Sequence, residues 1–299
     1  MTLHYDFKDD YKIIIDRLIQ SKYGHNIQSA DLEDALLSLG SFIRRLPPTQ
    51  VWTVIESDVF NPCGHEKEID AIKMRLTTGI DIKPYLSKTS KKYSYKDILL
   101  NNWDILHLHL GDTLGSDGYI SRTNDLLYCR FDRKSSIAYF IVIQPHGAWT
   151  NKSLLEVIDR NWPESIKEFY IADGQLVAPE PDEKALYTLS INNINALIEI
   201  NGKVYAPPGL GHAADGSALI DVLYMQQGVR LFKDTHKIFD NYLEQIKSNL
   251  ITLTKEDDIQ IHLTSFDVED DKISRINFMA IMIDNSISFS FDAKIMEDL

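Results

Sequence analysis

Two histidines one residue apart, His107 and His109, are the first candidates for chemistry in this sequence. They belong to the alternating segment 103–110, WDILHLHL. This pattern is typical of a β-strand that carries both imidazoles on one face and its leucines on the other. A third histidine, His146, closely follows the apolar run 138–143. If these two strands belong to one sheet, we expect the three imidazoles to converge.

Clustered imidazoles suit acid–base chemistry, because the pKa of histidine lies close to neutral pH. Cleavage of RNA without a metal ion needs a base for the 2′-hydroxyl proton, an acid for the leaving 5′-oxygen and a cation for the phosphorane. We assign His107 or His109 as the base, His146 as the acid and Arg122 as the cation. Because arginine binds phosphate oxygens bidentately, further phosphate-binding candidates are the basic residues Arg130, Arg133 and Lys134.

A histidine-ligated metal enzyme is one alternative, because three histidines are a sufficient ligand set for zinc. The spacing does not support it. A cupin-like His-x-His is followed within a few residues by a glutamate, and Gly111–Leu114 contain none. Cys63 and Cys129 lie far apart and outside any CxxC pair, so no cysteine zinc site or disulfide framework is encoded. We predict no metal ion and no other cofactor.

The distribution of charge favours the middle of the chain as an anion-binding region. The 299 residues contain 31 Lys and Arg against 44 Asp and Glu, a net charge of −13, which argues against a general polyanion binder. Residues 83–134, however, contain nine basic and six acidic residues, a net +3. Residues 250–299 contain four basic and eleven acidic residues, a net −7. An anion site is therefore compatible with the central region.

Two other motifs favour structural roles. The loop Gly209–Ser217 is rich in glycine but lacks the Lys-Ser/Thr ending of a phosphate-binding P-loop. Trp149 and Trp162 bracket a helical segment, so we expect them to pack the ends of that helix into the core rather than to stack on bases.

The elements that must position the histidines form a central unit, which we place at residues 93–170. It comprises strands at 103–110, 125–131 and 138–143, followed by an amphipathic helix through Leu154 and Ile158. We expect an antiparallel sheet with flanking helices.

The remaining regions complete an α+β fold. Residues 1–92 are expected to be mainly helical, and residues 171–299 to form an α+β region. Within the latter, Asn201-Gly202 between apolar runs predicts a hairpin. The last fifty residues alternate in blocks typical of a β-meander.

The order of elements from Trp103 to Pro163 resembles the RelE-type ribonuclease toxins of the wider barnase/RelE superfamily. The resemblance covers about a quarter of the chain. It implies a toxin-like endoribonuclease, in which His107, His109, Arg122 and His146 match family site positions. The chain departs from the pattern in its length, its acidity, and in Gly147-Ala148-Trp149 where the toxins have a basic tail. The segment LLNNWDILHLHLG is also similar to an uncharacterised bacterial family, which implies no mechanism.

A second alternative is a non-catalytic interaction protein, immunity or regulatory, whose acidic meander binds a basic partner. Histidines that are buried or that diverge in space would favour it. RNA and protein are thus both candidate partners.

No apolar run reaches the 18 residues of a membrane span, and the first residues lack a secretory signal pattern. We therefore expect no membrane partner and a cytoplasmic location.

Overall fold

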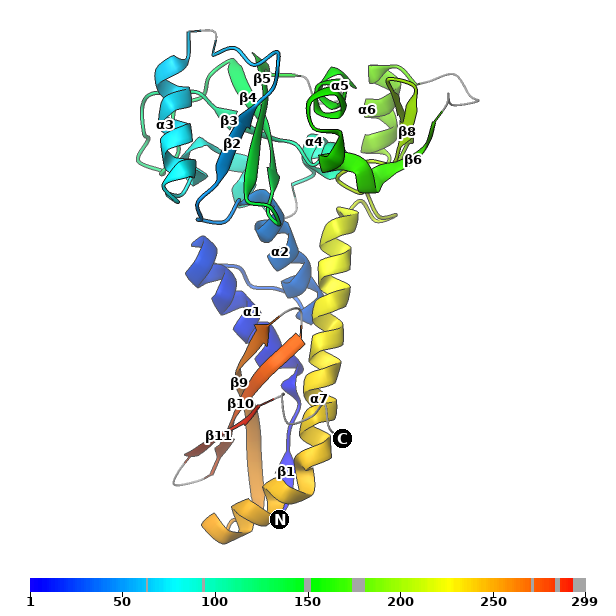
Figure 1. Ribbon diagram of the computed structural model, residues 1–299. Coiled ribbons are helices and arrows are strands. Elements are labelled where there is room, and N and C mark those ends of the chain that lie inside the picture. Colours follow the sequence, from blue (N-terminus) through cyan, green and yellow to red (C-terminus); the bar gives the residue numbers. More distant parts are fainter. Residues whose placement is uncertain are drawn as a thin grey trace. The chain divides into compact units, whose positions relative to one another are not determined.

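The computed structural model describes residues 1–62, 64–92, 95–147, 152–173, 181–269, 272–282 and 286–292 (Figure 1). The chain divides into two compact units. Unit 1 comprises residues 1–40 and 223–299, and unit 2 comprises residues 41–222. The predicted boundaries after residues 92 and 170 fall inside unit 2. The strand Thr53–Glu56 pairs with the strand Ile137–Pro145 across the first boundary, and the second falls within the strand Tyr170–Asp173.

The main sheet of unit 2 has four strands in the order β2-β5-β4-β3. Its strands are β2 (Thr53–Glu56), β3 (Leu106–His109), β4 (Asp125–Asp132) and β5 (Ile137–Pro145). The pairs β3–β4 and β4–β5 are antiparallel, as predicted, whereas β2 joins parallel to β5. The central antiparallel sheet is thus extended by a strand from the region expected to be mainly helical.

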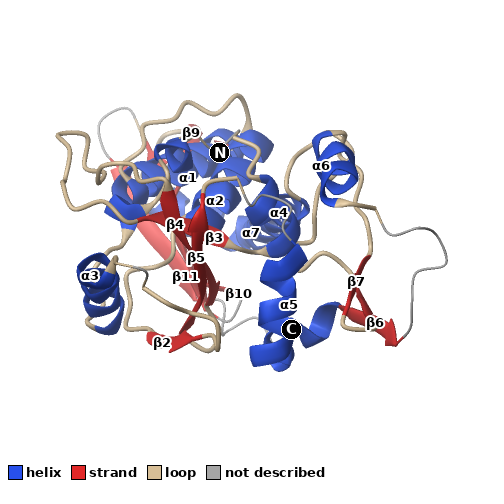
Figure 2. Cartoon of the chain, turned by 90° about the horizontal axis from the view of Figure 1, so that it is seen from above, coloured by secondary structure: helices blue, strands red, loops and turns tan. Residues whose placement is uncertain are grey.

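Helices cover both faces of this sheet (Figures 1 and 2). They are α3 (Glu66–Thr77) on one face and α4 (Ile98–Trp103) and α5 (Lys152–Asn161) on the other. The strand predicted at 103–110 begins only at Leu106. Trp103 instead ends α4, and Asp104 caps that helix in the left-handed conformation, with a φ of 56°.

A smaller sheet in unit 2 has the order β6-β8-β7. The elements around it are the 3-10 helix η3 (Pro163–Phe169), β6 (Tyr170–Asp173), α6 (Glu183–Ile191), β7 (Ile198–Ile200) and β8 (Lys203–Tyr205). The predicted hairpin β7–β8 is confirmed. Asn201 and Gly202 both have positive φ, at 50° and 74°, as a tight type I′ turn requires. Two further 3-10 helices, η1 (Lys83–Tyr85) and η2 (Lys88–Lys91), precede α4.

Unit 1 combines helices with the predicted meander. Its elements are β1 (Thr2–His4), α1 (Phe7–Tyr23), most of α2 (Leu32–Arg45), most of α7 (Leu219–Leu253), β9 (Asp258–Glu269), β10 (Lys272–Ile281) and β11 (Ser286–Asp292). The meander β9-β10-β11 is antiparallel, and β1 adds to β9 in parallel. The aromatic rings of Phe7, Phe239 and Phe278 lie 5.0 Å apart in its core. The α+β fold class is confirmed.

α7 runs without a break from Leu219 to Leu253, so it is one helix of 35 residues. The glycine inside this helix, Gly228, packs closely against the side chain of Leu36. A Cβ atom at this position would lie only 2.4 Å from Leu36 Cδ2, so a larger residue would clash. Of the helices formed by the described residues, none combines the length and the apolar composition needed to cross a membrane.

The loop Gly209–Ser217 is fixed by close backbone contacts, in keeping with a structural role. Gly211 has a φ of 76°, and a Cβ at this position would lie 2.0 Å from Asn195 Oδ1. That same oxygen accepts a hydrogen bond from His212 N at 2.8 Å.

We expect Gly211→Ala to destabilise the protein by about 2 to 4 kcal/mol, because it combines left-handed backbone strain with a steric clash. The matched control is Gly118→Ala. Gly118 also has a positive φ, 82°, but its Cβ would meet nothing within 4 Å. Only the backbone cost of about 1 to 2 kcal/mol is then expected. Urea denaturation measures both changes, and equal losses in the two variants would contradict the role of the Asn195 contact.

Candidate functional site

The structure brings the three predicted histidines together in unit 2. β3 presents His107 and His109 opposite Tyr128 and Leu126 of β4. The ring centroids of His107 and His109 are 6.0 Å apart, and those of His107 and His146 are 6.3 Å apart. His146 directly follows β5, and its backbone N–H donates to Asn124 O at 2.8 Å. Period-two alternation and strand pairing thus produce the convergence.

The histidines differ in their access to solvent. His107 and His109 are 6% and 5% exposed, whereas His146 and Arg122 are exposed. The site therefore has a buried floor and an open rim. The convergence of the three imidazoles agrees with a catalytic site. The burial of His107 and His109, in contrast, is the feature that we expected of an interaction protein.

Burial and neighbouring positive charge both keep the inner imidazoles neutral. Burial first of all, and then the charges of His107, Arg122, His146 and Lys88, lower the pKa of His109 to about 4. Burial also lowers the pKa of His107. Asp97 opposes this shift, while His146 and Arg122 add to it. A neutral imidazole can accept a proton at pH 7, as a general base must.

The imidazole of His109 contains a buried nitrogen that could bind a ligand or water. Within the described part of the chain, its Nδ1 has no hydrogen-bond partner. A buried polar atom of this kind is unusual and is most often satisfied by water, an ion or a ligand.

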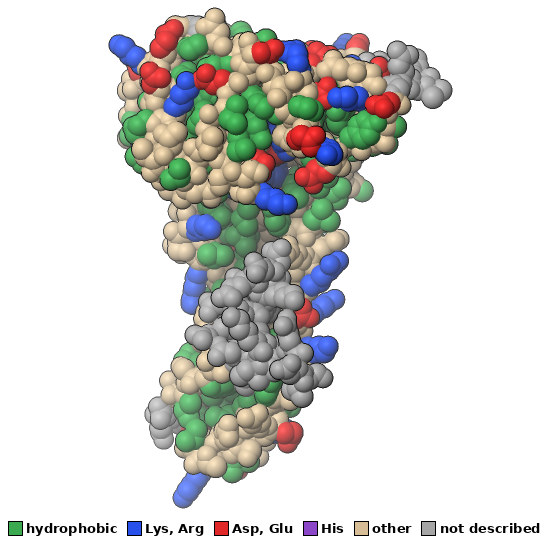
Figure 3. All heavy atoms as spheres, in the orientation of Figure 1, with side chains coloured by type: hydrophobic (Ala, Val, Ile, Leu, Met, Phe, Trp, Pro, Cys, Tyr) green, Lys and Arg blue, Asp and Glu red, His purple; other side chains and the backbone are tan. Residues whose placement is uncertain are grey.

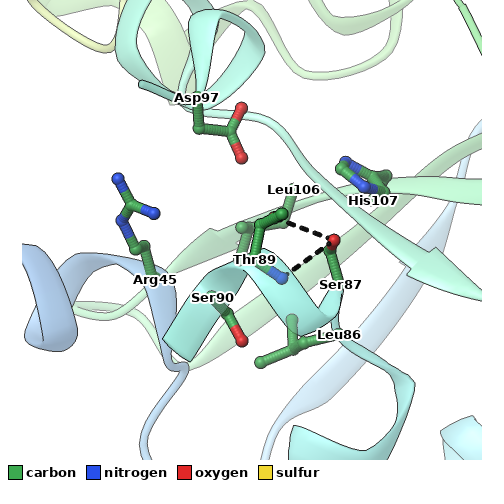
Figure 4. A pocket seen from close by; sticks show the side chains of 8 residues that line it. All are labelled: Arg45, Leu86, Ser87, Thr89, Ser90, Asp97, Leu106 and His107. Atoms are coloured by element: carbon green, nitrogen blue, oxygen red, sulfur yellow. Dashed lines mark hydrogen bonds between the residues drawn. The ribbon is translucent and has the colours of Figure 1, made fainter. Parts of the chain in front are cut away.

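A small pocket, with room for about one water molecule, adjoins His107 (Figure 4). Its walls come from the end of α2, from η2 and its flanking residues, from the start of α4 and from β3. They are formed by Arg45, Leu86, Ser87, Thr89, Ser90, Asp97, Leu106 and His107. Arg45 and His107 lie on either side of the pocket, with the Asp97 carboxylate between them. Sequence analysis did not identify Arg45 or Asp97, although Asp97 before an apolar run is a recognisable helix N-cap.

The three additional phosphate-binding candidates do not join the histidines. Arg130 is buried, pairs with Asp104 at 3.0 Å and donates to Ser165 O at 2.7 Å. Arg133 donates to Arg44 O at 2.9 Å, and Lys134 is exposed in the turn between β4 and β5.

Distance along β4 separates this basic group from the histidines. His109 pairs with Leu126, near the start of β4, whereas Arg133 and Lys134 follow its last residue, Asp132. The seven residue-to-residue steps from 126 to 133 span about 23 Å at about 3.3 Å per step. Arg122 is therefore the predicted cation that the structure associates with the histidines.

The remaining candidates have structural surroundings or lie outside the described residues. Trp162 packs against the core beneath α5, with its ring 4.7 Å from that of Tyr139, which confirms its predicted core role. Cys129 is buried, and burial raises the pKa of its thiol. Cys63 and Trp149 lie outside the described residues. Among those residues, no group of three or more His, Cys, Asp or Glu side chains is placed to hold a metal ion.

We expect stability to fall when the pH is lowered from 6.5 to 4, because burial lowers the pKa of both His109 and His212 to about 4. In this window the unfolded chain binds protons at these two positions and the folded chain does not, so their contribution is fully present above pH 6.5. The loss is on the order of 1 kcal/mol for each histidine, since nearby water screens part of the charge. Urea denaturation from pH 7.5 to 4.5 measures the slope. His212→Gln should reduce it, and an unchanged slope would contradict the assignment.

Charge is mixed on the face of unit 2 that Figure 3 shows. Acidic and basic side chains are interspersed there among apolar ones. In comparisons with protein-family models, curated proteins and solved structures, no match to this chain was found.

Proposed function

We propose that unit 2 is an endoribonuclease that cleaves RNA by histidine acid–base chemistry, without a metal ion. The observation that supports this best is the adjacency of three imidazoles, with centroids 6.0 and 6.3 Å apart, within the field of Arg122. The resemblance to RelE-type toxins belongs to the same proposal, and RNA as substrate implies action in the cytoplasm.

In the proposed reaction, neutral His109 or His107 accepts the proton of the 2′-hydroxyl group. The 2′-oxygen attacks the adjacent phosphorus, and the bond from phosphorus to the 5′-oxygen breaks. His146 donates a proton to that leaving oxygen, and Arg122 stabilises the negative charge of the phosphorane. The products are a 2′,3′-cyclic phosphate and a 5′-hydroxyl end. The exposed positions of His146 and Arg122 leave the rim open to a strand.

The test is cleavage of a labelled single-stranded RNA by the purified full chain in the presence of EDTA. We expect cyclic phosphate products, and no cleavage of the matching DNA, which lacks the 2′-hydroxyl group. His4→Ala, which removes a half-exposed histidine in unit 1, is the matched control and should cleave normally. Cleavage of DNA, or loss of RNA cleavage on chelation, would contradict the proposed chemistry.

The alternative that we keep is a non-catalytic interaction protein, and the burial of His107 and His109 favours it. The same assay separates the two functions, because this alternative predicts no RNA cleavage by the full chain under any condition.

A further inference from the structure

We propose that His107, rather than His109, is the general base of the RNA cleavage, and that Asp97 is its positioning residue. This inference rests on the proposed function, in which either histidine can take the proton of the 2′-hydroxyl group. It gives a role to the small pocket beside His107, because Asp97 and His107 both line that pocket.

The carboxylate of Asp97 is held close to His107. Asp97 is the N-cap of α4, and its Oδ1 accepts a hydrogen bond from Leu100 N at 3.0 Å. Figure 4 shows the carboxylate between the side chains of Arg45 and His107. Because the pocket has room for about one water molecule, a single water molecule is enough to link the carboxylate to the imidazole.

Arg45 provides a donor for such a water molecule. Its side chain is only 4% exposed. Nη1 donates to Lys92 O at 3.0 Å, and Nη2 donates to Tyr95 O. Within the described residues, the buried Nε has no partner. Buried water molecules make about three hydrogen bonds to polar groups, and the side chains of Arg45, Asp97 and His107 all line this pocket.

The charges that act on the two inner rings differ in sign. Burial is the main cause that lowers the pKa of both His107 and His109. Around His109 the charged neighbours that also lower the pKa are His107, Arg122, His146 and Lys88. At His107, in contrast, the Asp97 carboxylate raises the pKa, and this effect is larger than the opposing effects of His146 and Arg122.

Other ionisable groups lie around His107 on the neighbouring elements. They are His109 of β3, Tyr128 of β4, His146 after β5, Arg122 before β4 and Arg45 at the end of α2. These groups are neutral or positive at pH 7. Within this set Asp97 supplies the negative charge.

A general base gains positive charge as it takes a proton, so a carboxylate beside it favours the transfer. Such a carboxylate also orients the imidazole and stabilises the imidazolium that forms. A proton on His107 is stabilised by Asp97, whereas a proton on His109 meets positive neighbours. The acid is also close, because the ring centroids of His107 and His146 are 6.3 Å apart. The two rings can therefore act on one phosphate group.

The experiment measures kcat and KM for cleavage of a labelled single-stranded RNA by the full chain and its variants. His107→Gln should lower kcat by about a hundredfold or more, and His109→Gln by less than about tenfold. Asp97→Asn should lower kcat about tenfold and change KM by less than about twofold, because the carboxylate acts on the transition state. Asparagine caps helices as well as aspartate does, so this variant should fold normally.

A double variant separates positioning from a structural role. If Asp97 acts through His107, adding Asp97→Asn to His107→Gln should change kcat by less than about twofold. A structural role would instead cost the same factor in both backgrounds. The matched control is Asp182→Asn, which makes the same change at the N-cap of α6, where Oδ1 accepts from Ala185 N at 2.7 Å. This control should keep the wild-type kcat.

A larger loss of kcat in His109→Gln than in His107→Gln would overturn the inference. The same loss from Asp97→Asn with and without His107 would also overturn it. The contact is measured independently by ¹⁵N NMR of the imidazoles at pH 7. Asp97→Asn should shift the resonances of His107 more than those of His109, and Asp182→Asn should shift neither.

Unshifted His107 resonances in Asp97→Asn would overturn the contact whether or not the chain cleaves RNA. Shifted resonances in a chain that cleaves no RNA would support the contact between Asp97 and His107 and refute the nuclease. The two failures are therefore distinguishable.

Discussion

Alanine at both His107 and His146 is expected to lower the rate of RNA cleavage by at least a thousandfold. Each general acid or base contributes about 10²- to 10⁴-fold. The double variant is expected to lose less rate than the product of the two single losses, because the acid and the base act in the same step. The measurement is the initial rate of cleavage of a labelled RNA in EDTA, with wild-type protein and His4→Ala in parallel. Unchanged activity in the double variant would remove the assignment.

The single variant His146→Ala separates chemistry from folding. His146 is exposed, so its loss leaves no cavity, whereas His107 is buried and its replacement also removes packing. We expect His146→Ala to keep the wild-type unfolding midpoint and to lose at least a hundredfold in rate. Full activity in this variant would exclude His146 as the acid.

The second large effect concerns stability. Asp221→Ala is expected to destabilise unit 2 by about 3 to 5 kcal/mol, because it leaves a buried guanidinium without its partner. Arg44 and Asp221 are 7% and 6% exposed. They form two parallel hydrogen bonds, Nε to Oδ1 at 2.9 Å and Nη2 to Oδ2 at 3.1 Å. Urea denaturation of the wild type and the variant measures the difference.

An exposed ion pair in the same unit is the control. Glu164 and Lys167 are 80% and 72% exposed and lie 3.0 Å apart. Glu164→Ala should change the free energy of unfolding by about 0 to 1 kcal/mol, since such pairs are solvated and screened. If Asp221→Ala were equally mild, the Arg44 pair would not hold the unit together.

Local patterns in the sequence were sufficient to predict much of the fold and the centre of the site. Alternation at 103–110 predicts a strand with both histidines on one face, and the runs at 125–131 and 138–143 predict the two strands, β4 and β5, that extend its sheet. The Asn201-Gly202 turn and the C-terminal meander are also local signals, because each depends on residues close together in the chain.

What the sequence did not predict depends on contacts between distant segments. The parallel pairing of β2 with β5, for example, leaves no local signal. Arg45 reaches the pocket only because its guanidinium binds carbonyl groups about fifty residues later in the chain. Arg130, read as a phosphate ligand from its position in a basic stretch, pairs with Asp104 across a separation of 26 residues. Charge alone did not reveal that partner.

The two units differ in when they can fold during synthesis. Unit 2 is one continuous segment, 41–222, whereas unit 1 joins residues 1–40 to residues 223–299. β1 pairs with β9, from Thr2↔Asp258 onward, and α1 also contacts β9. A ribosome must therefore complete unit 2 before β9 exists, and contiguous domains generally fold as they emerge. Until β9 is synthesised, Phe7 and Ile19 of α1 lack their final packing partners. Both side chains are fully buried in the folded chain. We therefore expect unit 2 to fold first and residues 1–40 to complete unit 1 only after β9 has been synthesised.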